Sequence, residues 1–578
     1  MSVAGGPHWL LQGLQQRLSP AVGRSTLGAA CVTAILLLTT CTMLYESVYR
    51  MGVYEAYVVA ERTRVSIHVM CILAFLSLRW QLPGLCGTSG IIPAGNRIQE
   101  MRNLLSRGLE LPRVSETMIR AEIITHAWMR GEKWPPALER KRDHVRLVDI
   151  FTTRLVMLCD IGLCSALAGI FLPFPLSSLS LAICWFAYWV LKRSCGTFLN
   201  LQWDQLLLEC SALGCALSVP PLRLGAMWSL RMLLFKLVLS SGLCKVLSGC
   251  PKWSSLTAMD YHFWTQPLPT IIGYHLNRRL TPRLSRLMVW FTLFVQVFPV
   301  PWLLLLPYPL GAVGVWWIVL LMILIAFTGN YGFFNYLTCA LALTVPLGGT
   351  RRDDPYRLSD IIAICYGLVV GLGVTQPLLY TLDPLHPACH WASSVGHYLR
   401  PMAVGSGYGL FARMTTFRME LNFEAEVSPG GPWREIVFKH KPVDPTNPPY
   451  FLPIGHMPRL DWRLWFVPLG LMRGAPMPTW VDTFIERMLR HEPCVVDGLL
   501  PRQSFDWVAV SRIRVVLWNY TFGNDGWARE RLDTLYVASL GPRMGLVCRS
   551  PNSPEQPPTP SDSMSSSEEP LIVPLHES

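Results

Sequence analysis

Ten apolar runs, separated by short polar segments, fill the first two-thirds of the chain and constrain its fold more than any other feature. They cover about residues 27–45, 65–80, 151–172, 178–191, 204–219, 227–247, 287–306, 311–328, 333–347 and 360–380. A helix needs roughly 20 apolar residues to cross a hydrocarbon core about 30 Å thick. We therefore expect an α-helical multi-pass membrane bundle over 27–395. Its spans number about nine or ten, because the runs at 178–191, 204–219 and 333–347 are short.

The charge content agrees with a membrane protein. Charged residues make up 15% of the 578 residues, against about 25% in soluble proteins. A net charge of +12 is compatible with nucleic-acid binding, but the basic residues form short clusters beside apolar runs, as in loops that flank membrane helices. The composition thus excludes a cytosolic enzyme, a disordered chain and a nucleic-acid partner, and it favours contact with membrane lipids.

The polar segments between the runs predict an orientation. Arg17 and Arg24 precede the first run, and no acidic residue occurs before Glu46. Because positive flanks stay in the cytosol, we expect 1–26 to be cytosolic. The arginine-rich loop 277–286 is a second cytosolic marker, whereas 96–149 is expected to face solvent with short helices on the bilayer surface.

The pattern of apolar and polar residues changes after about residue 395, where the long apolar runs end. Apolar and polar residues alternate in 418–427, 434–439 and 511–522, which is typical of half-buried strands. Prolines cluster between them in 442–449. We expect a β-rich, sandwich-like soluble domain over 396–548, followed by a disordered, Pro- and Ser-rich tail over 549–578.

Polar groups inside the apolar runs are candidates for an intramembrane site. Asp160 and Lys236 each interrupt a run, and Gln202, Gln205 and Glu209 form one stripe of a helix. A charge at the bilayer centre costs about 2.5–3.5 kcal/mol on insertion scales, so such groups should face the bundle or a wet cavity. Pairing of these groups between helices is the alternative interpretation.

The segment 243–270 is the densest polar and aromatic stretch of the membrane half. Lys245 and His262 are weak candidates for acid–base catalysis. The alternative is an interfacial turn anchored by Trp253 and Trp264 and broken by prolines. The segment has no spacing typical of a metal site, a phosphate loop or a catalytic triad, and no cofactor or metal is expected.

Cysteine spacing and one glycosylation motif indicate which side of the membrane the C-terminal domain faces. The 17 cysteines include no C-x-x-C pair, and most lie in apolar runs as small buried residues. Cys494 and Cys548 alone fall in the C-terminal domain, where they form a disulfide or remain two buried thiols. Asn519 begins an Asn-Tyr-Thr acceptor for glycosylation on a predicted strand, which favours a lumenal face.

Several strings, in order, resemble the lipase maturation factor family. They lie at 198–209, 243–270, 328–338, 408–415 and 458–466, with weaker matches at 84–87 and 90–93. The chain departs from the family pattern at 453–457 and near its end, where Trp527 stands without a second Trp. The residues that carry the resemblance are Gln202, Trp203, Asp204, Glu209, Thr265, Gln266, Pro267, Asn330, Asn335, Arg459, Asp461 and Trp462.

The resemblance implies a non-enzymatic, chaperone-like factor of the endoplasmic reticulum membrane. Such factors help secreted homodimeric lipases to fold and assemble in the lumen, and they are linked to lumenal redox proteins. Their arrangement, with a cytosolic N-terminus and a lumenal C-terminal domain, requires an odd number of spans. As an alternative, the membrane half is remotely similar to the vitamin K-dependent carboxylase family, which would make Lys245 part of an intramembrane enzyme.

Overall fold

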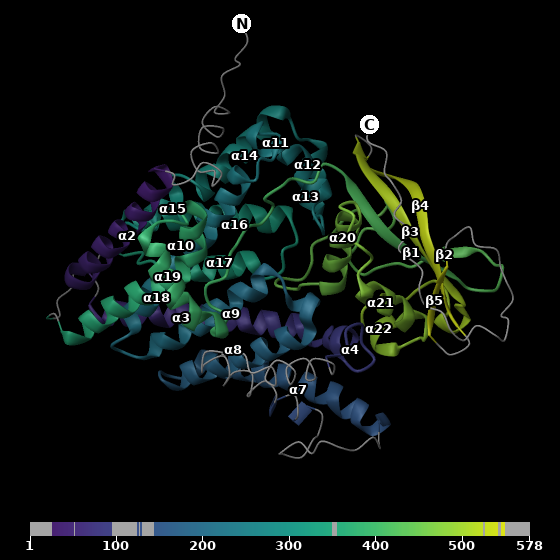
Figure 1. Ribbon diagram of the computed structural model, residues 1–578, viewed down its shortest axis with the longest axis horizontal. Coiled ribbons are helices and arrows are strands. Elements are labelled where there is room, and N and C mark those ends of the chain that lie inside the picture. The colour runs from purple at the N-terminus through teal and green to yellow at the C-terminus, as the bar shows by residue number, and fades with distance from the viewer. Residues whose placement is uncertain are drawn as a thin grey trace, which may run out of the picture.

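The apolar runs fold into helices that form one half of the molecule, and a β-sheet with short helices forms the other (Figure 1). The computed structural model describes residues 26–50, 52–94, 124–125, 128–129, 144–348, 355, 357–523, 526–541 and 545–549. The segment expected to be cytosolic, the surface loop 96–149 and the C-terminal tail fall almost entirely outside these residues.

Each of the ten apolar runs contains helix, although 287–306 is interrupted and 333–347 is helical only in its first part. The longer helices are α2 (Thr26–Tyr45), α3 (Val53–Arg79), α7 (His144–Phe171), α8 (Leu176–Cys195), α10 (Arg223–Leu247), α14 (Pro282–Gln296), α16 (Leu310–Thr328) and α18 (Leu358–Leu382). The shorter helices of this half are α4 (Leu82–Cys86), α9 (Gln202–Gly214), α11 (Pro251–Ser254), α12 (Met259–Thr265), α13 (Ile271–Arg278), α15 (Val300–Leu303), α17 (Phe334–Ala342) and α19 (Pro387–Leu399).

Five segments in the described part are long and apolar enough to cross a membrane. They are Thr26–Tyr49, Thr152–Phe171, Pro282–Leu303, Leu310–Thr328 and Leu358–Leu382. At 1.5 Å per residue, α9 and α17 are only about 20 and 14 Å long, well short of the hydrocarbon core. The five candidate spans confirm the expectation of a helical membrane bundle, whereas nine or ten as the number of spans remains a prediction.

Helix α10 is the central helix of this half, since nearly all of its side chains are buried. It packs closely on α18, where two glycines face one another. A Cβ on Gly225 would lie 2.2 Å from Ala363 O, and one on Gly367 would lie 3.0 Å from Gly225 Cα. The two backbones thus approach as small residues allow in membrane helix pairs.

The C-terminal part contains one antiparallel sheet in the order β2-β1-β3-β4-β5. Its strands are β1 (Arg418–Glu426), β2 (Trp433–Glu435), β3 (Arg512–Gly523), β4 (Gly526–Leu540) and β5 (Leu546–Arg549). The expected β-rich part is confirmed, with three strands in the predicted places. Helices α20 (Arg459–Leu471) and α21 (Thr479–Leu489) pack on the sheet, and α22 (Pro493–Val496) packs on α21 and α4. Helix α20 lies between the sheet and the helical half (Figure 1).

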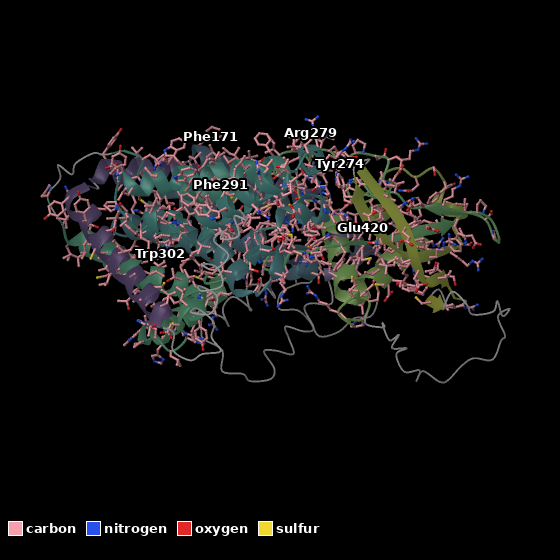
Figure 2. The ribbon with its side chains drawn as sticks, turned by 90° about the horizontal axis from the view of Figure 1, so that it is seen from above. Phe171, Tyr274, Arg279, Phe291, Trp302 and Glu420 are labelled. Atoms are coloured by element: carbon pink, nitrogen blue, oxygen red, sulfur yellow. A yellow bond between two sulfur atoms is a disulfide. The ribbon has the colours of Figure 1, made fainter. Side chains whose placement is uncertain are left out.

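Strand β1 differs from its predicted half-buried pattern, because both of its faces are buried. Leu421 and Phe423 pack in the core, while Arg418, Glu420 and Asn422 on the other face are also inaccessible. Figure 2 shows Glu420 among the side chains where the sheet meets the helical half. Alternation of polar and apolar residues identified the strand, but the polar face is covered by protein rather than by water.

Candidate functional site

Most of the residues that carry the family resemblance lie together where the two halves meet. We call this contact the seam. It joins 198–204, 264–270 and 328–331 of the helical half to 418–422 and 440–466 of the C-terminal part. The seam is built from segments that are distant in the chain, since Asp204 and Arg459 are 255 positions apart.

A buried ion pair lies at one end of the seam. Asp204, in the first turn of α9, accepts a hydrogen bond from the backbone N–H of Leu201. Arg459, the first residue of α20, donates from Nη1 to Oδ2 at 2.9 Å and from Nη2 to Oδ1 at 2.7 Å. Tyr188 donates its hydroxyl to Oδ1 at 2.5 Å. Neither partner is exposed, so solvent does not screen the pair.

An aromatic contact lies beside this ion pair. The rings of Trp203 and Trp462 meet edge to face, with centroids 4.9 Å apart. Trp462 donates from Nε1 to Asn330 O at 3.3 Å, and Tyr331 packs on the same indole at 5.9 Å. Tyr331 in turn donates its hydroxyl to Gln266 Oε1 at 2.9 Å. Trp462 of the C-terminal part thus contacts Trp203, Tyr331 and the backbone of Asn330 in the helical half.

The turn after α12 is held from the C-terminal part through its carbonyl groups. Arg418 on β1 donates to Trp264 O, Gln266 O and Pro267 O at 2.9, 2.5 and 3.0 Å. Trp465 on α20 donates from Nε1 to Thr265 O at 3.0 Å. A guanidinium presents a rigid fork of donors, and here its two terminal nitrogens bind three backbone carbonyl groups of the turn.

Asn330 joins the same turn to the loop before α20. Its Nδ2 donates to Pro269 O and to Tyr450 O, each at 3.2 Å, and its Oδ1 accepts from the backbone N–H of Leu452 at 3.2 Å. Both ends of the amide are therefore satisfied by backbone groups from the two halves.

Asp461 lies inside the C-terminal part and holds the segment after β2. It accepts from the backbone N–H groups of His440 and Lys441 at 3.0 and 2.8 Å. Burial raises the pKa of Asp461, and these two donors oppose that rise. Lys441 extends to Glu420 at 3.0 Å and to Asn422 at 2.6 Å, so Asp461 fixes the backbone that places this buried cation.

Polar groups within the membrane half mostly pair with one another. Glu209 pairs with Lys236 at 2.8 Å, with both side chains fully buried. Asp160 pairs with Arg79 at 2.5 Å, and Gln205 accepts from Lys192 at 2.7 Å. Gln202 Oε1 accepts from Gly409 N at 3.2 Å. The structure therefore matches the interpretation of these groups as interhelical partners.

The two weak catalytic candidates line a common cavity. Lys245 on α10 and His262 on α12 border it together with Asn335 on α17. Lys245 donates to Ser241 O at 2.7 Å and to Leu410 O at 3.0 Å, and His262 Nε2 lies 3.4 Å from Tyr331 Oη. Among the described residues, no group of three or more His, Cys, Asp or Glu could hold a metal ion.

Of the two alternatives for Cys494 and Cys548, the disulfide is wrong, because both thiols are free, although Cys494 is only partly buried and Cys548 is exposed. Cys494 lies in α22 and contacts Ser89 O at 3.5 Å, whereas Cys548 lies on the exposed edge strand β5. A disulfide instead joins Cys86 of α4 to Cys195 of α8, with Cα atoms 5.4 Å apart. Two cysteines from the membrane half, over 100 positions apart, thus provide the bond.

Asn519 lies on β3, where the strand prediction placed it. It is flanked by Met419 on β1 and Glu530 on β4, and its side chain is partly accessible. Its glycosylation remains a prediction.

Sequence reasoning missed three residues that organise the site: Tyr188, Arg418 and Glu420. Arg418 and Glu420 lie on the polar face of a strand that was predicted to be half-buried, and no local pattern distinguishes a polar face covered by protein from one covered by water. Tyr188 lies in the apolar run 178–191. Only its hydroxyl indicates that it needs a polar partner when buried, and the sequence does not show that this partner is Asp204.

Burial lowers the pKa of two histidines beside the seam, His440 and His456. Burial lowers the pKa of His440 to about 4, and the charge of Lys439 acts in the same direction. Burial also lowers the pKa of His456 to about 4, with His440 as a second cause. Both rings are neutral in the folded protein, whereas an unfolded chain binds protons below about pH 6.5.

We therefore expect stability that is present above pH 6.5 to be lost as the pH falls toward 4. Between pH 7.5 and 5.5 the loss is on the order of 1 kcal/mol for each histidine. Thermal unfolding of the purified full chain at both pH values measures it, with a His440→Asn, His456→Gln double variant as the control. An equal pH dependence of the double variant would contradict this origin.

Comparison with known proteins places these features in a family. The model of the lipase maturation factor transmembrane domain matches residues 60–347, and that of the lipase maturation factor C-terminal domain matches residues 404–536. No solved structure matches the chain.

Individual relatives agree with the family models. Lipase maturation factor 2 of Xenopus laevis is 32% identical, over 74% of this chain and 72% of its own length. Lipase maturation factor 2 of Homo sapiens is 26% identical over 81% of each chain, and lipase maturation factor 1 of Bos taurus is 27% identical over 61% of this chain and 70% of its own. With its apolar helices, its seam and these matches, the chain is a membrane protein that belongs to the lipase maturation factor family.

Proposed function

We propose that this protein is a maturation factor of the endoplasmic reticulum membrane that assists the folding and assembly of secreted homodimeric lipases. The names of its relatives support lipases as clients. The observation that carries the proposal is the seam: the residues of the family strings bind one half of the molecule to the other. Most of them are occupied in internal bonds, which suits a rigid platform for a client better than a reacting centre.

The C-terminal part is proposed to face the lumen, with the N-terminus in the cytosol. An odd number of spans places the two ends on opposite sides, and five helices in the described ranges have the required length and hydropathy. Lumenal redox proteins are proposed as further partners. Protease added to sealed microsomes should spare residues after about 400 if this orientation holds.

Lipase secretion tests the maturation role. In cells that lack this chain, we expect secreted lipase activity to fall several-fold and to return with the wild-type chain. Asp461→Asn should reduce the rescue, because Oδ1 of Asp461 accepts from both buried N–H groups, and a neutral amide oxygen accepts them more weakly than a charged carboxylate oxygen. Lys245→Ala should rescue much as the wild type does, at matched expression.

The enzyme alternative gives the opposite pattern. It is favoured by the position of Lys245 and His262 on one cavity. If Lys245→Ala abolished lipase secretion in a folded protein while Asp461→Asn did not affect it, an intramembrane enzyme would be the better assignment. Unchanged secretion without the chain would exclude the maturation role itself.

A further inference from the structure

One loop of the C-terminal part, at 447–455, presents apolar side chains on its outside, and we call it the proline loop. Tyr450, Phe451 and Ile454 are 50%, 41% and 72% exposed. The stretch 445–458 around it contains no Asp, Glu, Lys or Arg. Loops that meet only water are polar as a rule, and exposed apolar residues so close together indicate a contact surface.

The backbone of the proline loop is fixed, so its apolar side chains stay on the outside. Asn330 donates from Nδ2 to Tyr450 O and accepts at Oδ1 from the N–H of Leu452, each at 3.2 Å. Just after the loop, the N–H of Met457 donates to Ser77 Oγ at 2.7 Å. Three prolines within the loop fix their own φ angles. The loop therefore presents one preformed surface.

This surface continues onto a helix that is able to span the membrane. Phe451 and Ile454 of the loop line one groove together with Ile323 and Phe327 of α16. Both of these α16 side chains are exposed, and α16 is one of the five candidate spans. Exposed apolar side chains of a spanning helix face lipid. The outer surface of the loop is thus continuous with a lipid-facing surface.

The length of α16 indicates how deep the loop lies. Its 19 residues extend about 28 Å at 1.5 Å per residue, which is close to the thickness of the hydrocarbon core. A span of this length is embedded from end to end. Ile323 precedes the last residue, Thr328, by five positions, or about 8 Å along the axis. A loop that shares a groove with Ile323 therefore reaches the hydrocarbon boundary.

Helix α3 lies against the same loop. A Cβ on Gly455, whose φ is +74°, would lie 3.0 Å from Leu73 Cβ, so the loop backbone rests directly on α3. Val69 and Leu76, on the turns of α3 before and after Leu73, are exposed apolar residues. The loop is therefore bordered by apolar surface of the helical half at α3 as well as at α16.

We propose that the proline loop inserts into the lipid bilayer, with Phe451 and Ile454 in the hydrocarbon and Tyr450 at the head groups. The hydroxyl of Tyr450 donates to Lys439 O and lies 2.6 Å from His440 Nδ1, so its polar end is satisfied while its ring is exposed, as suits the interface. The loop attaches the C-terminal part to the membrane independently of the seam. This contact depends neither on the maturation role nor on the side that the C-terminal part faces.

Site-specific photocrosslinking of the purified full chain in phosphatidylcholine nanodiscs tests the insertion. The photoreactive residue p-benzoylphenylalanine replaces Ile454, Trp316 or Val508, one at a time. Trp316 is an exposed residue of α16, and Val508 is an exposed apolar residue of the C-terminal part that does not line the groove. We expect lipid adducts at position 454 to be as abundant as at 316 and several-fold more abundant than at 508.

A charge at the tip of the loop gives a second measurement. Ile454 is exposed, so Ile454→Asp removes little packing and would be nearly neutral in water. In hydrocarbon the same carboxylate is costly. We expect Ile454→Asp to lower the thermal midpoint in nanodiscs by several degrees, whereas Ile454→Leu and the matched control Val508→Asp leave it unchanged.

Three results would each overturn the proposal. The first is lipid adducts at position 454 no more abundant than at 508, while position 316 is strongly labelled. The second is an Ile454→Asp protein as stable in nanodiscs as Val508→Asp. The third is crosslinking from position 454 to a protein rather than to lipid in intact microsomes, which would assign the loop to a client or to a second copy of this chain.

Discussion

Replacing Arg459 with Met is expected to detach the C-terminal part from the helical half. The variant leaves the carboxylate of Asp204 buried at 0% exposure with only Tyr188 and one backbone N–H as donors. Removal of one partner from a buried ion pair costs about 3–5 kcal/mol, a large fraction of the stability of a typical domain. We expect a much lower thermal midpoint, rapid proteolysis after about residue 400, and lipase secretion near that of cells without the chain.

A double variant and a control define the origin of this effect. Asp204→Leu combined with Arg459→Met removes both charges and should recover part of the lost stability, because an apolar pair of similar volume replaces the ion pair. Arg463→Met is the matched control on the same helix, since Arg463 is partly exposed and has Asn200 O rather than an acid as its partner. Equal losses in Arg459→Met and Arg463→Met would contradict a specific role for the ion pair.

Truncating Trp462 is the second change with a large expected effect. Trp462→Ala removes an indole that is 4% exposed, its edge-to-face contact with Trp203 and its bond to Asn330 O. A buried Trp→Ala change costs about 3–5 kcal/mol. We expect a lower unfolding midpoint and loss of lipase rescue at matched expression.

A second variant separates the contribution of the Trp462 ring to stability from that of its N–H group. Trp462→Phe keeps an aromatic ring against Trp203 but lacks the donor, and it should cost about 1 kcal/mol for the lost hydrogen bond, with an added cavity term for the smaller ring. Trp391→Ala is the control, because Trp391 is 68% exposed on α19. A Trp462→Ala protein as stable as the Trp391→Ala control would show that the aromatic contact contributes nothing to the seam.

Features set by local periodicity were predictable from the sequence. The apolar runs predicted every long helix of the membrane half, because burial in lipid requires a continuous apolar surface. Alternation predicted β1, β2 and β3. Strand β4 was missed, since the charges of Arg529, Glu530, Arg531 and Asp533 follow one another and interrupt the alternation.

Partners distant in the chain were not predictable from local pattern. The string at 458–466 was assigned to a β-domain, but it forms α20, and Arg459 reaches back to Asp204 on α9. A disulfide was one of two alternatives for the cysteines of the C-terminal domain, yet the bond forms between Cys86 and Cys195. Both depend on how the helices pack, and short-range sequence statistics contain no information on that packing.

The distance in sequence between Asp204 and Arg459 sets an order for biosynthesis. Asp204 is synthesised 255 residues before Arg459. During translation the carboxylate on α9 therefore has no counter-charge until α20 has been made. A nascent or truncated chain that ends before Arg459 carries an uncompensated acid at a position that the finished protein keeps dry. The helical half is therefore complete in its electrostatics only when α20 is in place, although α20 belongs to the other half of the molecule.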